Sequence, residues 1–149
     1  MKPLEAPPGA FTLACVPTPD DIDENGHVNN VVYLRWAQDI AIAHWRSRVP
    51  PEEVAKQAWV VLRHEVDYRR PLMLGETATA RTWVGEASGP RFIRHVRIDA
   101  PDGTMSAQTV STWCLLDPAT KRPTRIPAWM IQMFADERAA MGLAEPSAD

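Results

Sequence analysis

The chain has 149 residues, of which 45% are hydrophobic and 23% are charged, and its formal net charge is −3. This length predicts one domain over residues 1–149 with a buried core. The mild negative charge gives no reason to expect a nucleic-acid partner. No apolar run has the length of a membrane span and no apolar leader follows the N-terminus, so the sequence predicts a cytoplasmic protein without a membrane partner. Cys15 and Cys114 are far apart and are expected to be reduced core residues.

A long apolar helix is predicted early in the chain. A short strand candidate, residues 11–16, comes first, and the polar segment 21–30 then leads into the helical residues 31–45. The helix ends before Pro50, because proline cannot continue it. Its polar residues form one narrow stripe, so most of its surface is expected to be covered. The stripe consists of Arg35, Gln38, Asp39 and Arg46.

Four strands and a second helix are predicted after the long helix, with proline- and glycine-containing turns between the strands. The strand candidates are residues 59–69, 77–86, 92–99 and 104–117. Side chains alternate in the first of them, which places on one face Leu62, His64, Val66 and Tyr68. The tail helix spans residues 127–142, with Pro127 at its start and Gly142 at its end. Its apolar stripe consists of Trp129, Met130, Met133 and Phe134.

The order of these elements predicts an α+β fold. Because strands and helices are segregated after the first helix, the sheet is expected to be antiparallel. Its strands are long enough for a sheet of about five strands to curl around the apolar helix. The core of this fold covers residues 11–117, and the tail helix adds to it.

The polar segment 21–30 is the candidate reactive site. It reads Asp-Ile-Asp-Glu-Asn-Gly-His-Val-Asn-Asn and combines carboxylate, amide and imidazole groups directly before a helix. The start of a helix stabilises developing negative charge through its free N–H groups. Asn29 or Asn30 is suited to cap the helix. Asp23 is either a reactive carboxylate or the acceptor of a local Asx-turn.

Residues 21–36 resemble the signature of hotdog-fold thioesterases. They follow the pattern Asp-x-Asp-x-Asn-x-His-Val-Asn-Asn-x-x-Tyr-x-x-Trp. The stretch is most similar to acyl-ACP thioesterases of plants and bacteria and to bacterial acyl-CoA thioesterases of the 4-hydroxybenzoyl-CoA type. Residues 65–70, Glu-Val-Asp-Tyr-Arg-Arg, resemble an acyl-ACP thioesterase segment that reads Leu-Glu-Tyr-Arg-Arg. The resemblance implies one hotdog domain, a homodimer or a dimer of dimers, and no cofactor.

This resemblance assigns roles to the polar segment. Asp23 corresponds to the essential carboxylate of the family. Asn25 and His27 correspond to the asparagine and the histidine that complete the acyl-ACP thioesterase site. Where the plant enzymes carry an acidic residue directly after Tyr-Arg-Arg, this chain has Pro71.

The predicted function is the hydrolysis of an acyl-CoA or acyl-ACP thioester to a free acid and a thiol. Asp23 acts in this prediction either as the nucleophile or as the general base that activates water. The oxyanion of the tetrahedral intermediate needs hydrogen-bond donors. Backbone N–H groups near Asn30 and Val31, at the helix start, are expected to provide them.

Arginine is the prevailing basic residue, and seven arginines lie between Arg63 and Arg97. Its planar guanidinium suits phosphate better than an ammonium group does, so a site for the CoA phosphates is predicted among these strands. The alternative is a solvated strand face. The candidate substrate-binding residues are Val31, Tyr33, Arg69, Arg70, Arg91 and Arg94.

Other functions are less well supported. A non-catalytic acyl-CoA-binding hotdog protein is the main alternative, since the fold also serves regulators. A hydratase of this fold is disfavoured because its Asp-x-Asn-Pro-x-His order is not found, and a serine esterase because no Gly-x-Ser-x-Gly motif occurs. No metal is expected, since no zinc-ligand spacing is present. Structural roles are expected for His44, His64 and His95. Core packing, or the lining of an acyl tunnel, is expected for Trp36, Trp45, Trp59, Trp83 and Trp113.

Overall fold

The computed structural model describes residues 2–143, so the two ends of the predicted domain, residue 1 and residues 144–149, lie outside the described residues. The strands are Phe11–Cys15 (β1), Ala58–Tyr68 (β2), Ala78–Ser88 (β3), Arg91–Asp99 (β4) and Met105–Leu116 (β5). The helices are Asn30–Arg48 (α1), Pro51–Val54 (α2) and Ala128–Ala140 (α3), and a 3-10 turn, η1, spans Pro19–Asp21. In this part of the chain no helix has the length and apolar character needed to cross a bilayer.

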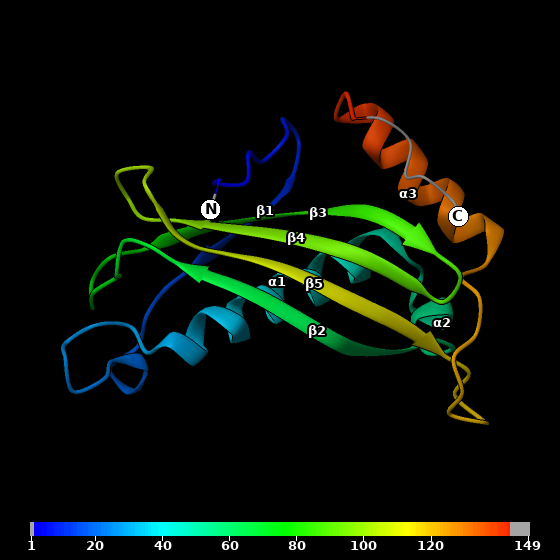
Figure 1. Cartoon of the computed structure of the whole chain (residues 1–149), viewed down its shortest axis with the longest axis horizontal. Helices are drawn as coiled ribbons and strands as arrows, with labels where there is room; N and C mark the ends of the chain where they lie inside the picture. The colour runs from blue at the N-terminus through cyan, green and yellow to red at the C-terminus, as the bar shows by residue number, and fades with distance from the viewer. Residues whose placement is uncertain (1, 144–149) are drawn as a thin grey trace.

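The strands form one antiparallel sheet in the order β1-β3-β4-β5-β2. Helix α1 lies along one face of this sheet, behind it in Figure 1. The contact buries one side of the helix and includes Tyr33, Trp36 and Ile40, of which Ile40 is fully buried. Small side chains on β3 such as Ala78 and Ala80 let the helix approach closely. This confirms the predicted α+β hotdog architecture.

Helix α1 is less covered than its composition predicts. Its opposite side is exposed and still carries two large apolar residues, Val31 and Ile42, with exposed fractions of 65% and 37%. The predicted cover of most of the helix surface is therefore incomplete in the single chain at Val31 and Ile42, because the sheet contacts only one side of the helix. Apolar surface left in this position needs another partner.

Strand β2 forms the edge of the sheet next to β5 and contains a bulge. Its register with β5 shifts between Val61 and Arg63, so Leu62 has no paired residue. From His64 onward the alternation holds as predicted, but Leu62 drops out of it and is 50% exposed. The bulge interrupts the predicted alternation at Leu62, because the extra residue locally disrupts the ladder.

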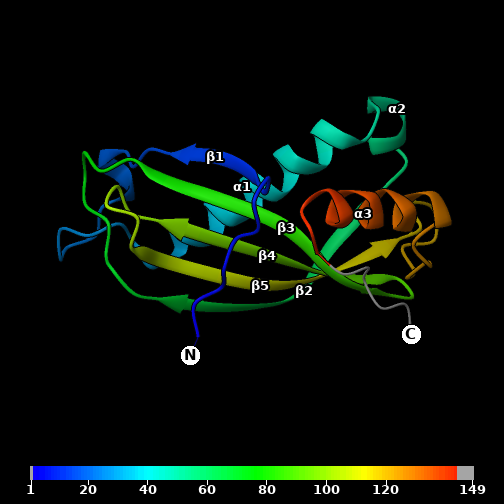
Figure 2. The same cartoon turned by 90° about the horizontal axis from the view of Figure 1, so that it is seen from above.

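Helix α3 covers the other edge of the sheet. Strand β1 pairs only with the first part of β3, and α3 lies beside the remainder (Figure 2). Arg138 donates to the carbonyl oxygen of Val84 at 2.6 Å. Met130 and Phe134 are buried as predicted, but Trp129 is 43% exposed and does not belong to the apolar stripe. Gly142 follows the end of the helix with a φ of 75°, a left-handed conformation that suits glycine at a helix stop.

The start of α1 is capped by Asn29 rather than by Asn30. The Asn29 side chain accepts a hydrogen bond from the N–H of Val31 at 3.1 Å. Asp21, which is 4% exposed, holds the loop against the helix by accepting from Arg35 at 2.9 Å and from the N–H of Thr18 at 2.9 Å. The hydrogen bond from Thr18 is the main reason that the pKa of Asp21 lies below its ordinary value.

We expect Asn29→Ala to lower the free energy of unfolding by about 1 kcal/mol, because the N–H of Val31 loses its cap. Urea denaturation followed by circular dichroism measures this. Asn30→Ala is the matched control, since the neighbouring exposed side chain makes no capping bond. Equal losses in the two variants would contradict the assignment of the cap.

Candidate active site

A cavity of about 300 Å³ opens where the polar loop, the start of α1 and the end of β2 meet. It brings together residues that lie far apart in the sequence. The predicted site residues that line it are Asp23, Asn25, His27, Asn30, Tyr33, Arg69 and Arg70. The five further lining residues were not among the candidate site residues, namely Val28, Asn29, Tyr68, Pro71 and Ser106.

Asp23 is held by its own loop. Its Oδ1 atom accepts from the backbone N–H of Asn25 at 2.9 Å and from that of His27 at 3.2 Å. The N–H of Asp23 donates to the carbonyl of His27 at 2.8 Å, and Gly26 completes the turn with a φ of 78°. The predicted Asx-turn therefore exists. It orients the carboxylate and leaves Oδ2 without a hydrogen bond among the described residues, so the structural and the reactive interpretation are compatible.

The helix start offers one of the two predicted N–H donors. The N–H of Val31 is taken by the Asn29 side chain, so the expectation that it binds an oxyanion is not supported. The N–H of Asn30 has no acceptor among the described residues. As the first N–H of a nineteen-residue helix, it lies at the positive end of the helix dipole. The arrangement supplies one backbone donor beside the carboxylate-bearing loop.

Two tyrosines fix this helix start to the sheet. Tyr68 donates from its hydroxyl to the carbonyl of Asn30 at 2.9 Å. The hydroxyl of Tyr33 accepts from the buried N–H of Leu72 at 3.1 Å, and the two rings meet edge to face at 5.6 Å. Tyr68 belongs to the Tyr-Arg-Arg stretch that the sequence singled out, so a signal for it was present. Ser106 had none, because it enters the cavity through the pairing of β5 with the end of β2.

The acidic residue that Pro71 replaces has no substitute in the cavity. Glu76 is near in sequence, but its carboxylate is bound by Arg70 at 2.8 Å and by the N–H of Met73 at 3.0 Å. Among the described residues that line the cavity, Asp23 is the only carboxylate. Acid–base chemistry by side-chain carboxylates in this cavity therefore depends on Asp23.

Three of the predicted substrate-binding residues lie outside this cavity. Val31 is exposed on α1 and does not line the cavity. Arg91 and Arg94 do not form a pair, because three positions along a strand place their side chains on opposite faces. Arg91 is exposed at the start of β4, about 26 Å along the strand from Asp99, which pairs with Met105 next to the cavity residue Ser106. Arg94 is buried against α1.

No group of three His, Cys, Asp or Glu side chains in residues 2–143 is arranged to hold a metal ion. His44, His64 and His95 are separate from the cavity. Burial lowers the pKa of each of these three imidazoles. Cys15 and Cys114 are free and buried, which confirms their predicted core positions.

The profile of the thioesterase-like superfamily matches residues 17–134, which contain the whole cavity. The chain belongs to the thioesterase-like superfamily. Family membership makes it a thioester hydrolase and confirms the activity class predicted from the signature. No curated protein sequence matches this thioesterase.

Solved structures show the same fold at low sequence identity. SAV2348 from Staphylococcus aureus, in complex with CoA, has a TM-score of 0.77 and 18% identity, over 98% of this chain and 91% of that chain. A thioesterase from Thermus thermophilus, complexed with coenzyme A and Zn, has a TM-score of 0.74 and 24% identity, over 83% of this chain and 95% of that chain. The 12:0-ACP thioesterase from Umbellularia californica has a TM-score of 0.76 and 17% identity, over 86% of this chain and 50% of that chain.

Proposed function

We propose that this thioesterase hydrolyses an acyl-CoA or acyl-ACP thioester and that Asp23 is its acting carboxylate. The observation that carries the proposal is that Asp23 is the only carboxylate among the described lining residues and is pre-oriented by two backbone N–H groups. The N–H of Asn30 lies at the same cavity as the proposed oxyanion donor. The CoA complexes of two structural neighbours and the 12:0-ACP thioesterase support the two substrate forms.

Two routes use these groups. As a general base, Asp23 takes a proton from water while the water oxygen bonds to the thioester carbon. The oxyanion accepts a hydrogen bond from the N–H of Asn30, and its collapse expels the thiolate, which takes up the proton. As a nucleophile, Asp23 displaces the thiolate to form an anhydride, which water then cleaves. A single turnover in ¹⁸O-labelled water separates the routes, because attack of water on the aspartyl carbon of the anhydride puts label into Asp23, whereas the general-base route labels only the released acid.

We expect Asp23→Asn to lose nearly all thioester hydrolysis and to keep its fold. The amide oxygen of asparagine can still accept from the two loop N–H groups, so the loss reports on charge rather than on loop structure. Steady-state hydrolysis of a panel of acyl-CoA and acyl-ACP substrates measures the change.

Asn25→Ala and His27→Ala serve as graded comparisons in the same assay. Each is expected to lower turnover about ten- to a thousandfold, the range for one oxyanion donor or one proton-transfer partner. Near wild-type turnover in Asp23→Asn, with intact circular dichroism, would remove Asp23 from the mechanism. Tight acyl-CoA binding without hydrolysis in the wild type would favour the non-catalytic alternative.

We propose further that Arg69 contacts the CoA phosphates. Its side chain lines the cavity and is exposed. Arg70 is the weaker candidate, because its guanidinium is bound by Glu76 and lies 3.7 Å from Asp102. Exposed charges attract phosphate most strongly at low ionic strength.

Arg69→Gln should therefore raise KM for acyl-CoA severalfold, and more at low salt than at high salt. Arg91→Gln is the control, since Arg91 is an exposed arginine distant from the cavity. An equal rise in KM for an acyl-N-acetylcysteamine thioester, which lacks the nucleotide, would argue against a direct phosphate contact.

We propose that the active unit is a homodimer or a dimer of dimers in which β2 edges meet. The edge strand exposes Val60 and Leu62 by 37% and 50%, and unpaired strand edges associate readily. The exposed apolar residues Val31 and Ile42 of α1 give a second surface on the chain that needs cover. Such an arrangement would place the Asp23 cavity, which ends at Tyr68 of β2, beside the partner chain.

Leu62→Glu should shift the protein toward monomers and lower turnover, because it places a charge in the proposed contact. Analytical ultracentrifugation at assay concentration measures the first effect. Trp129→Glu is the matched control, as this residue is similarly exposed on α3 at the other edge of the sheet (Figure 1). A wild-type monomer with full activity would overturn the proposal.

A further inference from the structure

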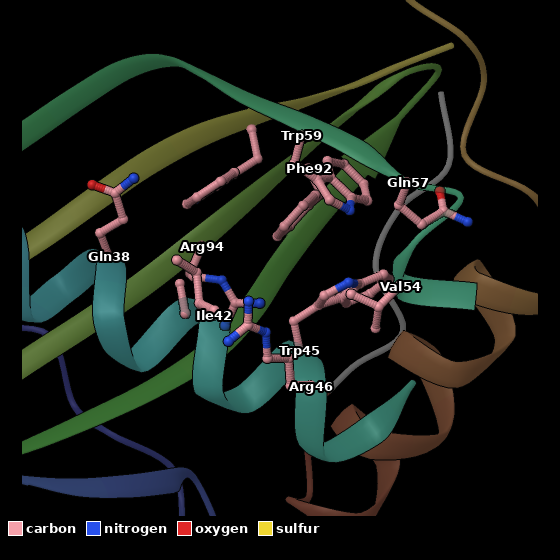
Figure 3. A pocket seen from close by; sticks show the side chains of 11 residues that line it. Gln38, Ile42, Trp45, Arg46, Val54, Gln57, Trp59, Phe92 and Arg94 are labelled. Carbon is pink, nitrogen blue, oxygen red and sulfur yellow. The ribbon is translucent and has the colours of Figure 1, made fainter. Parts of the chain in front are cut away.

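A second cavity, of about 360 Å³, lies along the C-terminal half of α1 and is not used by the chemistry described above. Figure 3 shows its lining side chains, which come from both helices α1 and α2 and from the sheet. Four of them are aromatic, namely Trp45, Trp59, Phe92 and Trp113. The lining includes two arginines, Arg46 and Arg94, and no carboxylate among the described residues. The cavity is therefore apolar in its walls and positive in its charge.

Arg94 provides the buried charge of this cavity, with an exposed fraction of 3%. Its Nη1 atom donates to Nδ1 of His44 at 3.0 Å and to Oγ1 of Thr82 at 3.0 Å. Its guanidinium also lies 5.5 Å from the ring centroid of Phe92. The other edge of the guanidinium, formed by Nε and Nη2, has no hydrogen-bond partner among the described residues. These two N–H groups form the fork that binds both oxygens of a carboxylate.

His44 and Glu137 hold Arg94 in place without occupying that edge. Arginine only donates hydrogen bonds, so Nδ1 of His44 must accept and its Nε2 carries the proton. Nε2 contacts the carboxylate of Glu137 on α3. Burial is the main cause that lowers the pKa of His44, which agrees with a neutral ring. Glu137 therefore makes no hydrogen bond to Arg94, although its negative charge acts on the guanidinium across the imidazole and partly offsets the effect of burial on the pKa of Arg94.

A buried guanidinium without a directly bound anion is costly. Burial lowers the pKa of Arg94 to about 10, so the group still carries its charge at neutral pH. An anion in the cavity would complete its hydrogen bonds and compensate the charge. The aromatic walls favour a ligand that is otherwise apolar. A phosphate fits less well, because one free arginine edge satisfies a single carboxylate but leaves phosphate oxygens against aromatic carbon.

We propose that this second cavity binds an apolar carboxylate, with its carboxylate on the Nε–Nη2 edge of Arg94 and its hydrocarbon part among Trp45, Trp59, Phe92 and Trp113. Such a carboxylate has two sources. It is the distal end of an acyl group, in which case the inference rests on the proposed function, or it is a free carboxylic acid. From Asn30 to Ala41, α1 rises about 16 Å, so a distal carboxylate belongs to a long acyl group.

Calorimetric titration of the wild-type protein with 4-phenylbutanoate and with its neutral isostere 4-phenylbutanamide tests the site without requiring turnover. The carboxylate is expected to bind about tenfold or more tightly than the amide, because its bonds to arginine are charge-assisted. Arg94→Gln should abolish this difference. Arg91→Gln is the matched control and should preserve it, since Arg91 lies three positions away on the opposite face of β4.

A second variant covers the case in which Arg94→Gln does not fold. Ile42→Trp adds bulk at a partly exposed lining position and leaves the network of Arg94, His44 and Glu137 unchanged, and it should lose carboxylate binding. Equal binding of carboxylate and amide to the wild type, no binding of either, or unchanged binding in Ile42→Trp would each overturn the proposal. In these outcomes Arg94 has a purely structural role.

Whether the carboxylate belongs to an acyl group or to a free acid is identified by comparing the hydrolysis of dodecanedioyl-CoA and dodecanoyl-CoA. If the acyl group supplies the carboxylate, kcat/KM favours dodecanedioyl-CoA in the wild type and Arg91→Gln, and the preference is lost in Ile42→Trp. If a free acid supplies it, the two substrates react alike while 4-phenylbutanoate still binds. Binding of 4-phenylbutanoate through Arg94 without hydrolysis of any thioester would refute the proposed function and leave the carboxylate site standing.

Discussion

The hydrogen bonds of the buried Asp21 carboxylate are the interaction on which the cavity around Asp23 depends. Asp21 accepts hydrogen bonds from Thr18 before the loop and from Arg35 one turn inside α1, and its backbone carbonyl accepts from the N–H of Asn29. These bonds tie both ends of the polar loop to the helix. Because the loop is closed in this way, Asp23 stands beside the helix start rather than in a mobile segment. Asp21, the first aspartate of the signature, thus has a structural role, whereas Asp23 keeps its Oδ2 atom without a hydrogen bond among the described residues.

The sequence predicted the parts of the site that are local. The carboxylate, the asparagine, the histidine and the helix start lie within ten residues, and periodicity places them before an apolar helix. The predictions from the sequence failed where a single residue changes the backbone pairing or occupies a backbone N–H group. The bulge at Leu62 shifts the faces of β2, and the cap of Asn29 occupies the N–H of Val31. Neither effect follows from composition or spacing, since both depend on which hydrogen bonds the folded backbone leaves unmade.

The misassignment of Arg94 has a different origin. The period of a strand already places Arg91 and Arg94 on opposite faces, so the sequence contained the argument against a joint phosphate site. The sequence did not predict which residues contact Arg94. His44 and Glu137 are separated from it by 50 and 43 positions, and only the packing of α1 and α3 on the sheet brings the three together. Long-range networks of this kind are set by tertiary packing.

The two cavities along α1 differ in chemical character, because only the first has a carboxylate among its described lining residues. The first places Asp23 beside Arg69 and Arg70, and the second has aromatic walls with a buried guanidinium. In the proposed mechanism, hydrolysis creates a new carboxylate next to Asp23, and two neighbouring negative charges disfavour each other. The same repulsion would orient a substrate with a second carboxylate, because that group is disfavoured near Asp23 and favoured near Arg94.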